Sequence, residues 1–307
     1  MKTIRIGTRG SDLALVQAAA TERALVHAFP DELIRRQVIR TTGDRRTDVA
    51  LSEVAKVEGV LDKGVFTKEL EIALLANEVD IAVHSLKDVP TVVDPAFEIV
   101  GTLKRAPVRD VLVMRSGGGI DALAQGSTVG TSSVRRAKQL LWLRPDLKVI
   151  DIRGNVPTRL RKLVDGGYDA IMLAEAGLTR LGYPMGVPCT VAGQPLHFVP
   201  LAENEFFPAA GQGAIGFEIR ADDDAARTWV AAICHQETFV RARAEREFLR
   251  LIDGGCHTPV GVFSSLENGR LDMAARLFPD EGGDPQTAKA SGSDPFEVAR
   301  ELYESLA

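Results

Sequence analysis

Cysteine is scarce in this sequence, with three residues among 307: Cys189, Cys234 and Cys256. A small and odd number of cysteines does not form a disulfide framework, so we expect a protein of a reducing compartment and predict a cytoplasmic location. The pairs Cys234-His235 and Cys256-His257 lack the C-x₂-C or H-x₃-H spacing of zinc sites. The sequence therefore predicts no metal site.

Long hydrophobic runs and an excess of positive charge are also missing. No apolar run approaches the ~20 residues that a transmembrane helix needs, and the first residues enter a strand pattern without the apolar segment of a secretory signal. The 37 Lys and Arg residues against 42 Asp and Glu residues give a net charge of −5. This balance gives no reason to expect nucleic acid or a membrane as a partner. We expect a monomer that acts on a small molecule.

What the sequence does contain is the alternating pattern of an α/β protein. With 307 residues, 45% of them hydrophobic, the chain can bury the cores of two or three domains. In the first hundred residues, strand patterns alternate with helical patterns at 3–7 (strand), 13–29 (helix), 37–41 (strand), 69–77 (helix) and 80–84 (strand). Alternation at this spacing predicts βαβ units and a mostly parallel sheet.

The alternation then repeats in a second region. Strand and helix patterns follow at 111–114, 128–130, 134–143 (helix), 148–152, 158–165 (helix) and 170–174. From about residue 227, two helices, two strands and a last helix predict a smaller α+β domain. We therefore predict two similar α/β lobes that face a cleft, with domain limits at 1–104 with 202–221, 105–201 and 222–307. Segment 209–220 has strand character, and its pattern alone leaves open whether it returns to the first sheet.

Three junctions between a strand and a helix contain similar sets of hydroxyl and charged residues. They are residues 8–11 (Thr-Arg-Gly-Ser), 84–88 (His-Ser-Leu-Lys-Asp) and 131–136 (Thr-Ser-Ser-Val-Arg-Arg). Helix N-termini favour anions, and arginine adds forked donors that match carboxylates. Any one junction is more often a serine N-cap beside a solvated arginine. Three of them at equivalent places favour anion binding.

The local charge supports this interpretation. Residues 131–180 contain ten Lys and Arg residues against five Asp and Glu residues, in a chain that is negative overall. Within this stretch Arg153, Arg159 and Arg180 follow strand ends or helix starts, whereas Arg161 and Lys162 are typical of a solvated face. The asymmetry favours a small polyanionic ligand.

One cysteine has an unusual setting, Gly254-Gly255-Cys256. A lone cysteine is more often buried and inert, but two preceding glycines favour a thiol presented on a loop and used as a nucleophile. His84 fits a general base and a packed polar residue at a strand end equally well. A hydrolase that combines Cys256 with His84 lacks any supporting local signature. Residues 211–216 match G-x-G-x-x-G, but a strand pattern follows where a dinucleotide site needs a helix.

Seven stretches in order read RIGTRGSDLAL, DIAVHSLKDVP, VGTSSVRRAKQL, IRGNVPTRL, YDAIMLAEAGLTRLG, PAAGQGAIGFEIR and GGCHTPVG. Between about residues 4 and 264 they resemble the successive signatures of the porphobilinogen deaminases (hydroxymethylbilane synthases). The resemblance implies two lobes like those of periplasmic binding proteins and a third, smaller domain. It also implies a dipyrromethane cofactor, which is bound to Cys256 through a thioether.

The resemblance assigns residues as well. The family's catalytic aspartate falls on Asp88. Cofactor contacts fall on Lys87, Ser133, Arg135 and Arg136, and substrate carboxylates would be bound by Arg9, Ser11, Arg153, Arg159 and Arg180. Lys63 and Phe66 would lie in an active-site flap. Here the sequence departs from the family, because residues 57–66 look longer than its short Gly-Gly-Lys-Gly turn, and Lys56 and Lys63 do not align with family lysines one by one.

The implied reaction is the stepwise condensation of four porphobilinogen molecules into linear hydroxymethylbilane, with release of ammonia, in haem biosynthesis. Asp88 would oppose the positive charge of the azafulvene that forms when ammonia leaves. Cys256 would keep the growing chain attached. A rival interpretation is a non-catalytic binding protein for a small carboxylate, which explains the arginines equally well but gives no reason for Asp88 and Cys256.

Overall fold

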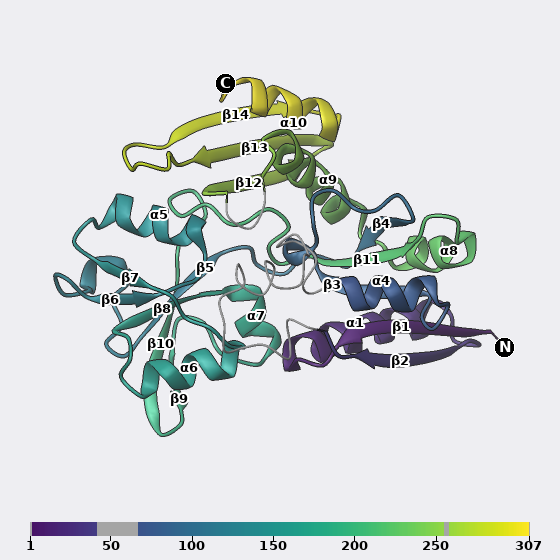
Figure 1. Ribbon diagram of the computed structural model, residues 1–307, viewed down its shortest axis with the longest axis horizontal. Helices are drawn as coiled ribbons and strands as arrows, with labels where there is room; N and C mark the ends of the chain where they lie inside the picture. Colours follow the sequence, from purple (N-terminus) through teal and green to yellow (C-terminus); the bar gives the residue numbers. More distant parts are fainter. Residues whose placement is uncertain (1, 42–66, 255–257, 307) are drawn as a thin grey trace. The chain divides into compact units, whose positions relative to one another are not determined.

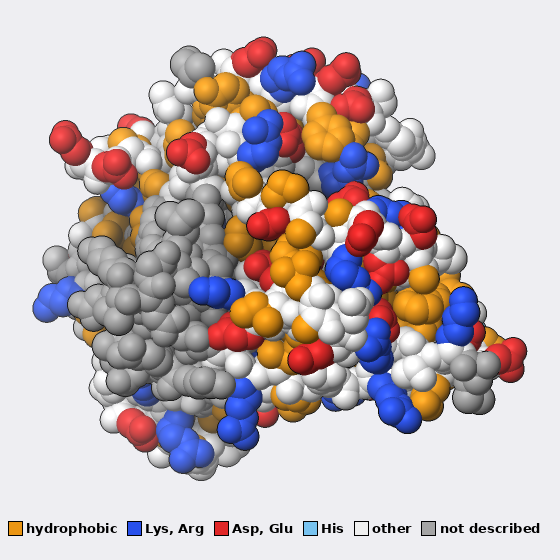
Figure 2. Space-filling model, turned by 45° about the vertical axis from the view of Figure 1, so that its right-hand side comes forward, with side chains coloured by type: hydrophobic (Ala, Val, Ile, Leu, Met, Phe, Trp, Pro, Cys, Tyr) orange, Lys and Arg blue, Asp and Glu red, His pale blue; other side chains and the backbone are white. Residues whose placement is uncertain are grey.

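The computed structural model describes residues 2–41, 67–254 and 258–306 (Figure 1). The chain forms two compact units: unit 1 comprises Met1–Ala106 and Gly213–Arg243, and unit 2 comprises Pro107–Gln212 and Ala244–Ala307. No helix in the described ranges is both long enough and apolar enough to cross a membrane. On the face shown in Figure 2, Lys and Arg side chains lie interspersed with Asp and Glu side chains.

Unit 1 is built on a five-stranded sheet in the order β2 (Leu33–Ile39), β1 (Thr3–Arg9), β3 (Ile81–Ser85), β11 (Ile215–Arg220) and β4 (Phe97–Thr102). Strand β1 runs parallel to β2 and β3, whereas β11 runs antiparallel to β3 and β4. Strand β11 comes from far later in the sequence than its neighbours. The segment that the sequence left open therefore returns to the first sheet.

Helices cover both faces of this sheet. Helices α1 (Asp12–Ala28) and α8 (Asp224–Ile233) bury one face through a core that includes Ile4, Ile81 and Phe217. Helix α4 (Lys68–Leu75) packs Leu70 on the other face. A Cβ atom on Gly7 would lie 3.1–3.3 Å from side-chain atoms of Val79 and Leu70, so glycine lets α4 approach the sheet closely. Ser11 caps α1, because its side chain accepts a hydrogen bond from a backbone N–H of the first turn.

Unit 2 contains a six-stranded sheet in the order β7 (Lys148–Ile150), β6 (Thr128–Gly130), β8 (Ala170–Ala174), β5 (Asp110–Met114), β10 (Gln194–Pro200) and β9 (Pro188–Val191). Helix α5 (Val134–Leu143) packs Leu140 on one face. Helices α6 (Val156–Val164) and α7 (Glu175–Arg180) pack Leu160 and Leu178 on the other. Strands β6, β7 and β8 are parallel neighbours, so their carboxyl ends meet at one edge.

The C-terminal part of unit 2 is an antiparallel sheet of β12 (Val260–Glu267), β13 (Arg270–Leu277) and β14 (Gln286–Gly292). Its core takes residues from the end of α9 (Gln236–Leu251), such as Phe248, and from α10 (Pro295–Glu304), such as Leu302. Gly261 lies against Phe207, whose Cβ atom would be 2.4 Å from a Cβ at that position. The sheet therefore packs closely on the segment that precedes β11.

The predicted fold class is confirmed in its architecture: two α/β lobes with mixed sheets and a smaller C-terminal α+β part. The expectation that the sheets are mostly parallel is wrong. Among the described strands of the two α/β sheets, four pairs are parallel and five are antiparallel. Parallel pairs do not predominate because β11 inserts antiparallel into the first sheet, while β5, β10 and β9 add antiparallel pairs to the second.

Three further expectations about elements need correction. The strand predicted at 37–41 is β2 at Leu33–Ile39, the C-terminal sheet has three strands rather than two, and β4, β9 and β10 were not predicted. Polar residues interrupt the period-2 pattern of β2 and also weaken the strand signal of β9 and β10. Strands β9 and β10 also contain prolines, which are unfavourable in strands. The domain limits at 1–104 with 202–221, 105–201 and 222–307 stay a prediction.

Candidate active site

The first two junctions of the sequence meet at one edge of the sheet in unit 1. Strands β1 and β3 are parallel neighbours, so Arg9 at the end of β1 and Ser85 at the end of β3 leave the sheet on the same side. Arg9, Ser11, Ser85 and Asp88 line a single pocket there. The structure thus brings together the proposed catalytic aspartate and two of the proposed substrate-binding residues.

One polar residue of this pocket, Gln17, was missed by the sequence analysis, and it contacts Ser85 of the second junction. Two hydrogen bonds join the side chains of Gln17 on α1 and Ser85. Gln17 Nε2 donates to Ser85 Oγ at 2.8 Å, and Ser85 Oγ donates to Gln17 Oε1 at 3.1 Å. The Gln17 side chain is buried on the sheet-facing side of α1. A polar residue on the apolar face of a predicted helix is the signal that could have identified it.

The turn that carries Lys87 and Asp88 is fixed by the strand that returns to this sheet. Leu86, Lys87 and Asp88 form the short 3₁₀-helix η1, and the Leu86 N–H donates to the Ala214 carbonyl at 3.1 Å. A Cβ atom on Gly216 of β11 would come within 2.7 Å of Leu86 Cδ1. Lys87 and Asp88 are half-buried. The glycine therefore lets η1 sit directly on β11, which positions Asp88 at the pocket.

His84 belongs to the same pocket and is also packed. Its Nε2 atom lies 2.9 Å from Glu218 Oε2, and both side chains are almost fully buried. The structure shows the packed polar residue, and because His84 also lines the pocket, its use as a general base stays a prediction.

The third junction lies in unit 2, at the edge where β6 and β7 end. Ser133 caps α5 by accepting from the Arg136 N–H at 3.4 Å, and the Ser133 N–H donates to Thr131 Oγ1 at 3.2 Å. Ser132 Oγ donates to the Ile152 carbonyl at 2.6 Å. Because Arg153 directly follows Ile152, the structure brings the third junction and Arg153 to one edge of the sheet.

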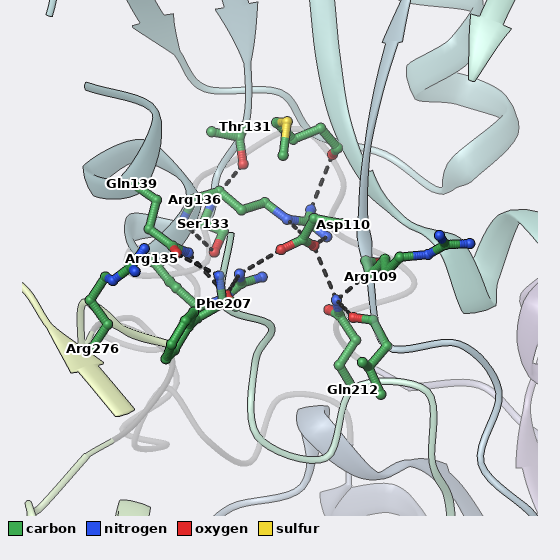
Figure 3. Close-up of polar contacts among 12 residues, drawn as sticks. Arg109, Asp110, Thr131, Ser133, Arg135, Arg136, Gln139, Phe207, Gln212 and Arg276 are labelled. Atoms are coloured by element: carbon green, nitrogen blue, oxygen red, sulfur yellow. Dashed lines mark hydrogen bonds and ion pairs between the residues drawn. The ribbon is translucent and has the colours of Figure 1, made fainter. Parts of the chain in front are cut away.

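Arg135 and Arg136 are buried and converge on one carboxylate, Asp110 at the start of β5 (Figure 3). Arg135 Nη1 donates to Asp110 Oδ2 at 2.5 Å and to the Phe207 carbonyl at 2.6 Å. Arg136 donates to Asp110 Oδ1 from Nε at 2.9 Å and from Nη2 at 2.6 Å. Gln212 Nε2 donates to the same Oδ1 at 3.1 Å. Asp110 is thus the counter-ion of both arginines.

The electrostatics of this cluster favour an ionised carboxylate, although burial lowers the pKa of Arg136. Burial alone would raise the pKa of Asp110, but the guanidinium groups of Arg135 and Arg136 outweigh it and hold the pKa of this carboxyl well below its usual value. Asp110 was missed by the sequence analysis. Its signal was an acidic residue at the start of the otherwise apolar run Asp-Val-Leu-Val-Met.

The two arginines differ in what they leave for a ligand. Each side-chain nitrogen of Arg136 donates to the protein, to Asp110 or to the Met172 carbonyl. Among the described residues, the hydrogen bonds of Arg135 all come from Nη1, which leaves Nε and Nη2. Arg135 therefore has donors that no described residue uses, whereas every side-chain nitrogen of Arg136 bonds within the protein.

The remaining predicted arginines also lie in unit 2. Arg153 Nε is buried and has no hydrogen-bond partner in the described part of the chain. Arg159 Nε donates to the Gly154 carbonyl at 2.7 Å. Burial lowers the pKa of Arg180, the last residue of α7, to about 10. Arg153 and Arg159 are half-buried.

Three predicted site residues, Lys63, Phe66 and Cys256, lie outside the described residues, as does Lys56. The G-x-G-x-x-G stretch at 211–216 is a turn that leads into β11, the context in which the sequence analysis rejected a dinucleotide site. Its Gly211 N–H donates to Glu245 Oε2 at 2.7 Å. In this protein the stretch serves to position Gln212 and β11.

Fold and site together define a protein of two α/β lobes with hydroxyl and basic side chains at the carboxyl ends of its parallel strands. The family model "Porphobilinogen deaminase, dipyromethane cofactor binding domain" matches residues 4–228, and "Porphobilinogen deaminase, C-terminal domain" matches residues 239–307. The chain therefore belongs to the porphobilinogen deaminase family.

Individual relatives match this chain over nearly its whole length. The porphobilinogen deaminase of Syntrophobacter fumaroxidans is 44% identical over 313 residues, which cover 99% of this chain and 95% of that protein. The porphobilinogen deaminase of Paracoccus denitrificans is 42% identical over 309 residues, covering 99% and 93%. Among solved structures, the "BenM effector binding domain with its effector benzoate" matches with a TM-score of 0.44 and 14% identity, covering 79% of this chain and 90% of that one. A structural similarity of that degree carries no functional argument.

Proposed function

We propose that residues at the strand ends of both units serve one reaction, the deaminating condensation of porphobilinogen. As a member of its family, the chain is a hydroxymethylbilane synthase: it joins four porphobilinogen molecules into linear hydroxymethylbilane and releases ammonia at each step. The reaction belongs to porphyrin and haem biosynthesis. The observation that carries the proposed residue roles is the single pocket shared by Arg9, Ser11 and Asp88.

Asp88 is the proposed catalytic residue. When ammonia leaves porphobilinogen, the remaining azafulvene is a cation, and a carboxylate held beside the pyrrole N–H stabilises it. Arg9 and Ser11 line the same pocket and would bind the acetate and propionate of the incoming pyrrole. Each such charged hydrogen bond contributes about 1.5–3 kcal/mol. Lys87, adjacent to Asp88 on η1, would bind the cofactor.

The dipyrromethane cofactor of the family fits the donors of unit 2. Each of its pyrroles carries an acetate and a propionate, and two side-chain nitrogens of Arg135 make no hydrogen bond within the described part of the chain. Ser133, Arg135 and Arg136 are therefore assigned to the cofactor. When bound, the cofactor supplies the free α-carbon to which the first substrate is joined.

The growing chain adds an acetate and a propionate with each pyrrole. Arg153, Arg159 and Arg180 are assigned to these carboxylates. A carboxylate at Arg153 would satisfy its buried Nε, a donor for which the described residues offer no acceptor.

Cys256 is the proposed point of attachment. Burial raises the pKa of the Cys234 thiol, so less of the nucleophilic thiolate is present at neutral pH. Cys189 and Cys234 are both half-buried. Peptide mapping of the purified protein should place the mass of two linked pyrroles on the Cys256 peptide, and the Cys256→Ser protein should lack it. The Cys234→Ser protein is the control and should keep it; extra mass on Cys189 or Cys234 would refute the assignment.

A turnover assay tests the function itself. The purified protein, incubated with porphobilinogen, should release ammonia and form hydroxymethylbilane, and an aldehyde reagent for pyrroles should colour the resting protein. A non-catalytic carboxylate-binding protein would instead bind porphobilinogen, release no ammonia and have the mass of the bare chain. That result would refute the enzyme.

The setting of the enzyme is part of the proposal. It acts as a monomer in the cytoplasm, without a nucleic-acid or membrane partner, and its domains have the limits 1–104 with 202–221, 105–201 and 222–307. Lys63 and Phe66 belong to its flap. Light scattering of the purified protein should give the mass of one chain, and a dimer would contradict this part.

A further inference from the structure

A histidine and a glutamate form a buried pair behind the pocket of unit 1. His84 Nε2 lies 2.9 Å from Glu218 Oε2, and the two side chains are 4% and 0% exposed. His84 also lines the pocket that contains Asp88. An acid–base pair that none of the roles above uses therefore reaches the proposed site.

The strands hold this pair in place. Strands β3 and β11 are antiparallel with His84 opposite Gly216, so Glu218 lies diagonally across and on the same face as His84. The register of β11 against β4 shifts between Phe217 and Glu218. Irregularities of this kind re-aim side chains and are frequent beside active sites. The backbone of these strands thus holds the Glu218 carboxylate against the His84 imidazole.

The protein satisfies only one oxygen of Glu218 within the described ranges. Oε2 contacts His84, whereas the second oxygen, Oε1, is buried and has no hydrogen-bond partner among the described residues. Burying a carboxylate in this way is costly unless a partner compensates it. His84 Nε2 is the partner that the structure places there, which leaves Nδ1 as the other ring nitrogen.

Charged groups face the pair from the neighbouring elements. Burial and the negative charge of Glu218 both raise the pKa of Glu71 on α4. On the pocket side, Asp88 and Arg9 line the same space as His84. The pair therefore lies beside the carboxylate proposed to be catalytic and beside a group proposed to bind the substrate.

We propose that His84, held by Glu218, is a proton carrier of the condensation and acts beside Asp88. The inference rests on the proposed function. As the C–N bond of porphobilinogen breaks, His84 gives the proton on Nδ1 to the aminomethyl nitrogen, which leaves as ammonia with the bonding electron pair. When the α-carbon of the growing chain attacks and the new C–C bond forms, that carbon loses its proton to His84 Nδ1, and its ring regains aromaticity. One proton leaves the pair and one returns in each cycle.

Kinetics of matched variants test the role. The His84→Gln protein should lose about 100-fold in the rate of a single condensation, the scale of general acid–base catalysis. Glu218→Gln keeps a hydrogen-bonding side chain but removes the charge, so it should also be slow and should shift the pH dependence of the rate. His27→Gln, an exposed change at the end of α1, is the control. Both slow variants should carry the cofactor mass and the wild-type circular dichroism.

A pair that only joins two strands predicts a different result. In that case the rate of Glu218→Gln would stay within about twofold of the wild-type rate, with the same pH profile, even if the free energy of unfolding changed. A twofold change is too small for the loss of a proton carrier. That outcome would overturn the proposal.

Nitrogen NMR of the imidazoles gives a readout that does not depend on turnover. The chain has five histidines, so the His84 signal is the one that His84→Gln removes. A proton carrier must take up and release a proton, so this signal should change with pH in the wild type and should differ in Glu218→Gln, where Nε2 loses its charged partner. A His84 signal that does not change with pH overturns the proposal even where a variant fails to fold. A wild-type protein that releases no ammonia would instead refute the proposed function, while the NMR result still reports on the pair.

Discussion

Asp110 Oδ1 accepts hydrogen bonds from two nitrogens of Arg136, Nε at 2.9 Å and Nη2 at 2.6 Å. Asp110 Oδ2 binds Arg135. A single carboxylate therefore sets the plane of one guanidinium and the position of another, and the arginines assigned to the cofactor depend on an acid that would not touch the cofactor.

Removal of the Asp110 charge should destabilise unit 2. Asp110→Asn leaves two buried guanidinium groups without a counter-ion, and breaking a buried ion pair in this way costs about 3–5 kcal/mol. Urea unfolding measures the loss. Glu98→Gln is the control, because its pair with Arg227 is exposed and should change the free energy of unfolding by no more than about 1 kcal/mol. Equal losses in both proteins would show that Asp110 does not hold the cluster.

The same carboxylate should make stability depend on pH. The pKa of folded Asp110 lies below its unfolded value of about 3.9, so the stabilisation is present above that pH and is lost as pH falls toward the folded pKa. The wild type should therefore lose more stability than Asp110→Asn when unfolding is measured at pH 3 rather than pH 6. If the free energy of unfolding fell equally in the two proteins between pH 6 and pH 3, a lowered pKa of Asp110 would be contradicted.

Charge at residue 88 should decide turnover. Asp88→Glu keeps the carboxylate but moves it by about one methylene, so weak activity should remain, whereas Asp88→Asn and Asp88→Ala should nearly abolish turnover. Steady-state rates measure this, and circular dichroism checks the fold. A purely structural Asp88 that shapes the turn before Pro90 would accept asparagine well. Wild-type speed in Asp88→Asn would thus remove the catalytic role.

The arginines of unit 2 should separate by stage. Arg135→Leu should give protein without the dipyrromethane mass, because its free donors are assigned to the cofactor. Arg153→Leu should keep that mass and stall during chain growth, since each lost charged hydrogen bond costs about 1.5–3 kcal/mol. Intact mass after incubation with porphobilinogen shows each stage. Arg161→Leu, on the exposed side of α6, is the control; if all three behave alike, the arginines are a solvated face.

Local patterns predicted the elements that carry clear signals. Helix α5 begins and ends where its amphipathic period and the Ser133 cap indicate, and β8 coincides with an apolar run. Edge strand β2, which contains two adjacent arginines, lacks such a pattern. Its place depends on pairing with β1, which the sequence does not encode locally.

Some residues of the candidate site could likewise be predicted from the sequence, and others could not. Junction residues such as Arg9 and Asp88 lie beside strand ends, so their placement follows from the order of elements. Asp110 and Glu218 could not be found by that route, because each meets its partner only through the order of strands in a sheet. Asp110 stands 25 and 26 residues before its arginines, and Glu218 stands 134 residues after His84.

The late arrival of β11 has a consequence for synthesis on the ribosome. Strand β11 lies between β3 and β4, so these two strands cannot be joined until residues 215–220 have left the exit tunnel. Until then the nascent chain carries two unpaired strand edges, while Phe217, a fully buried residue of that core, has not been made. The first lobe to be translated is thus completed only after the second has been translated. A truncated product of the first hundred or so residues should aggregate and depend on chaperones in the cell.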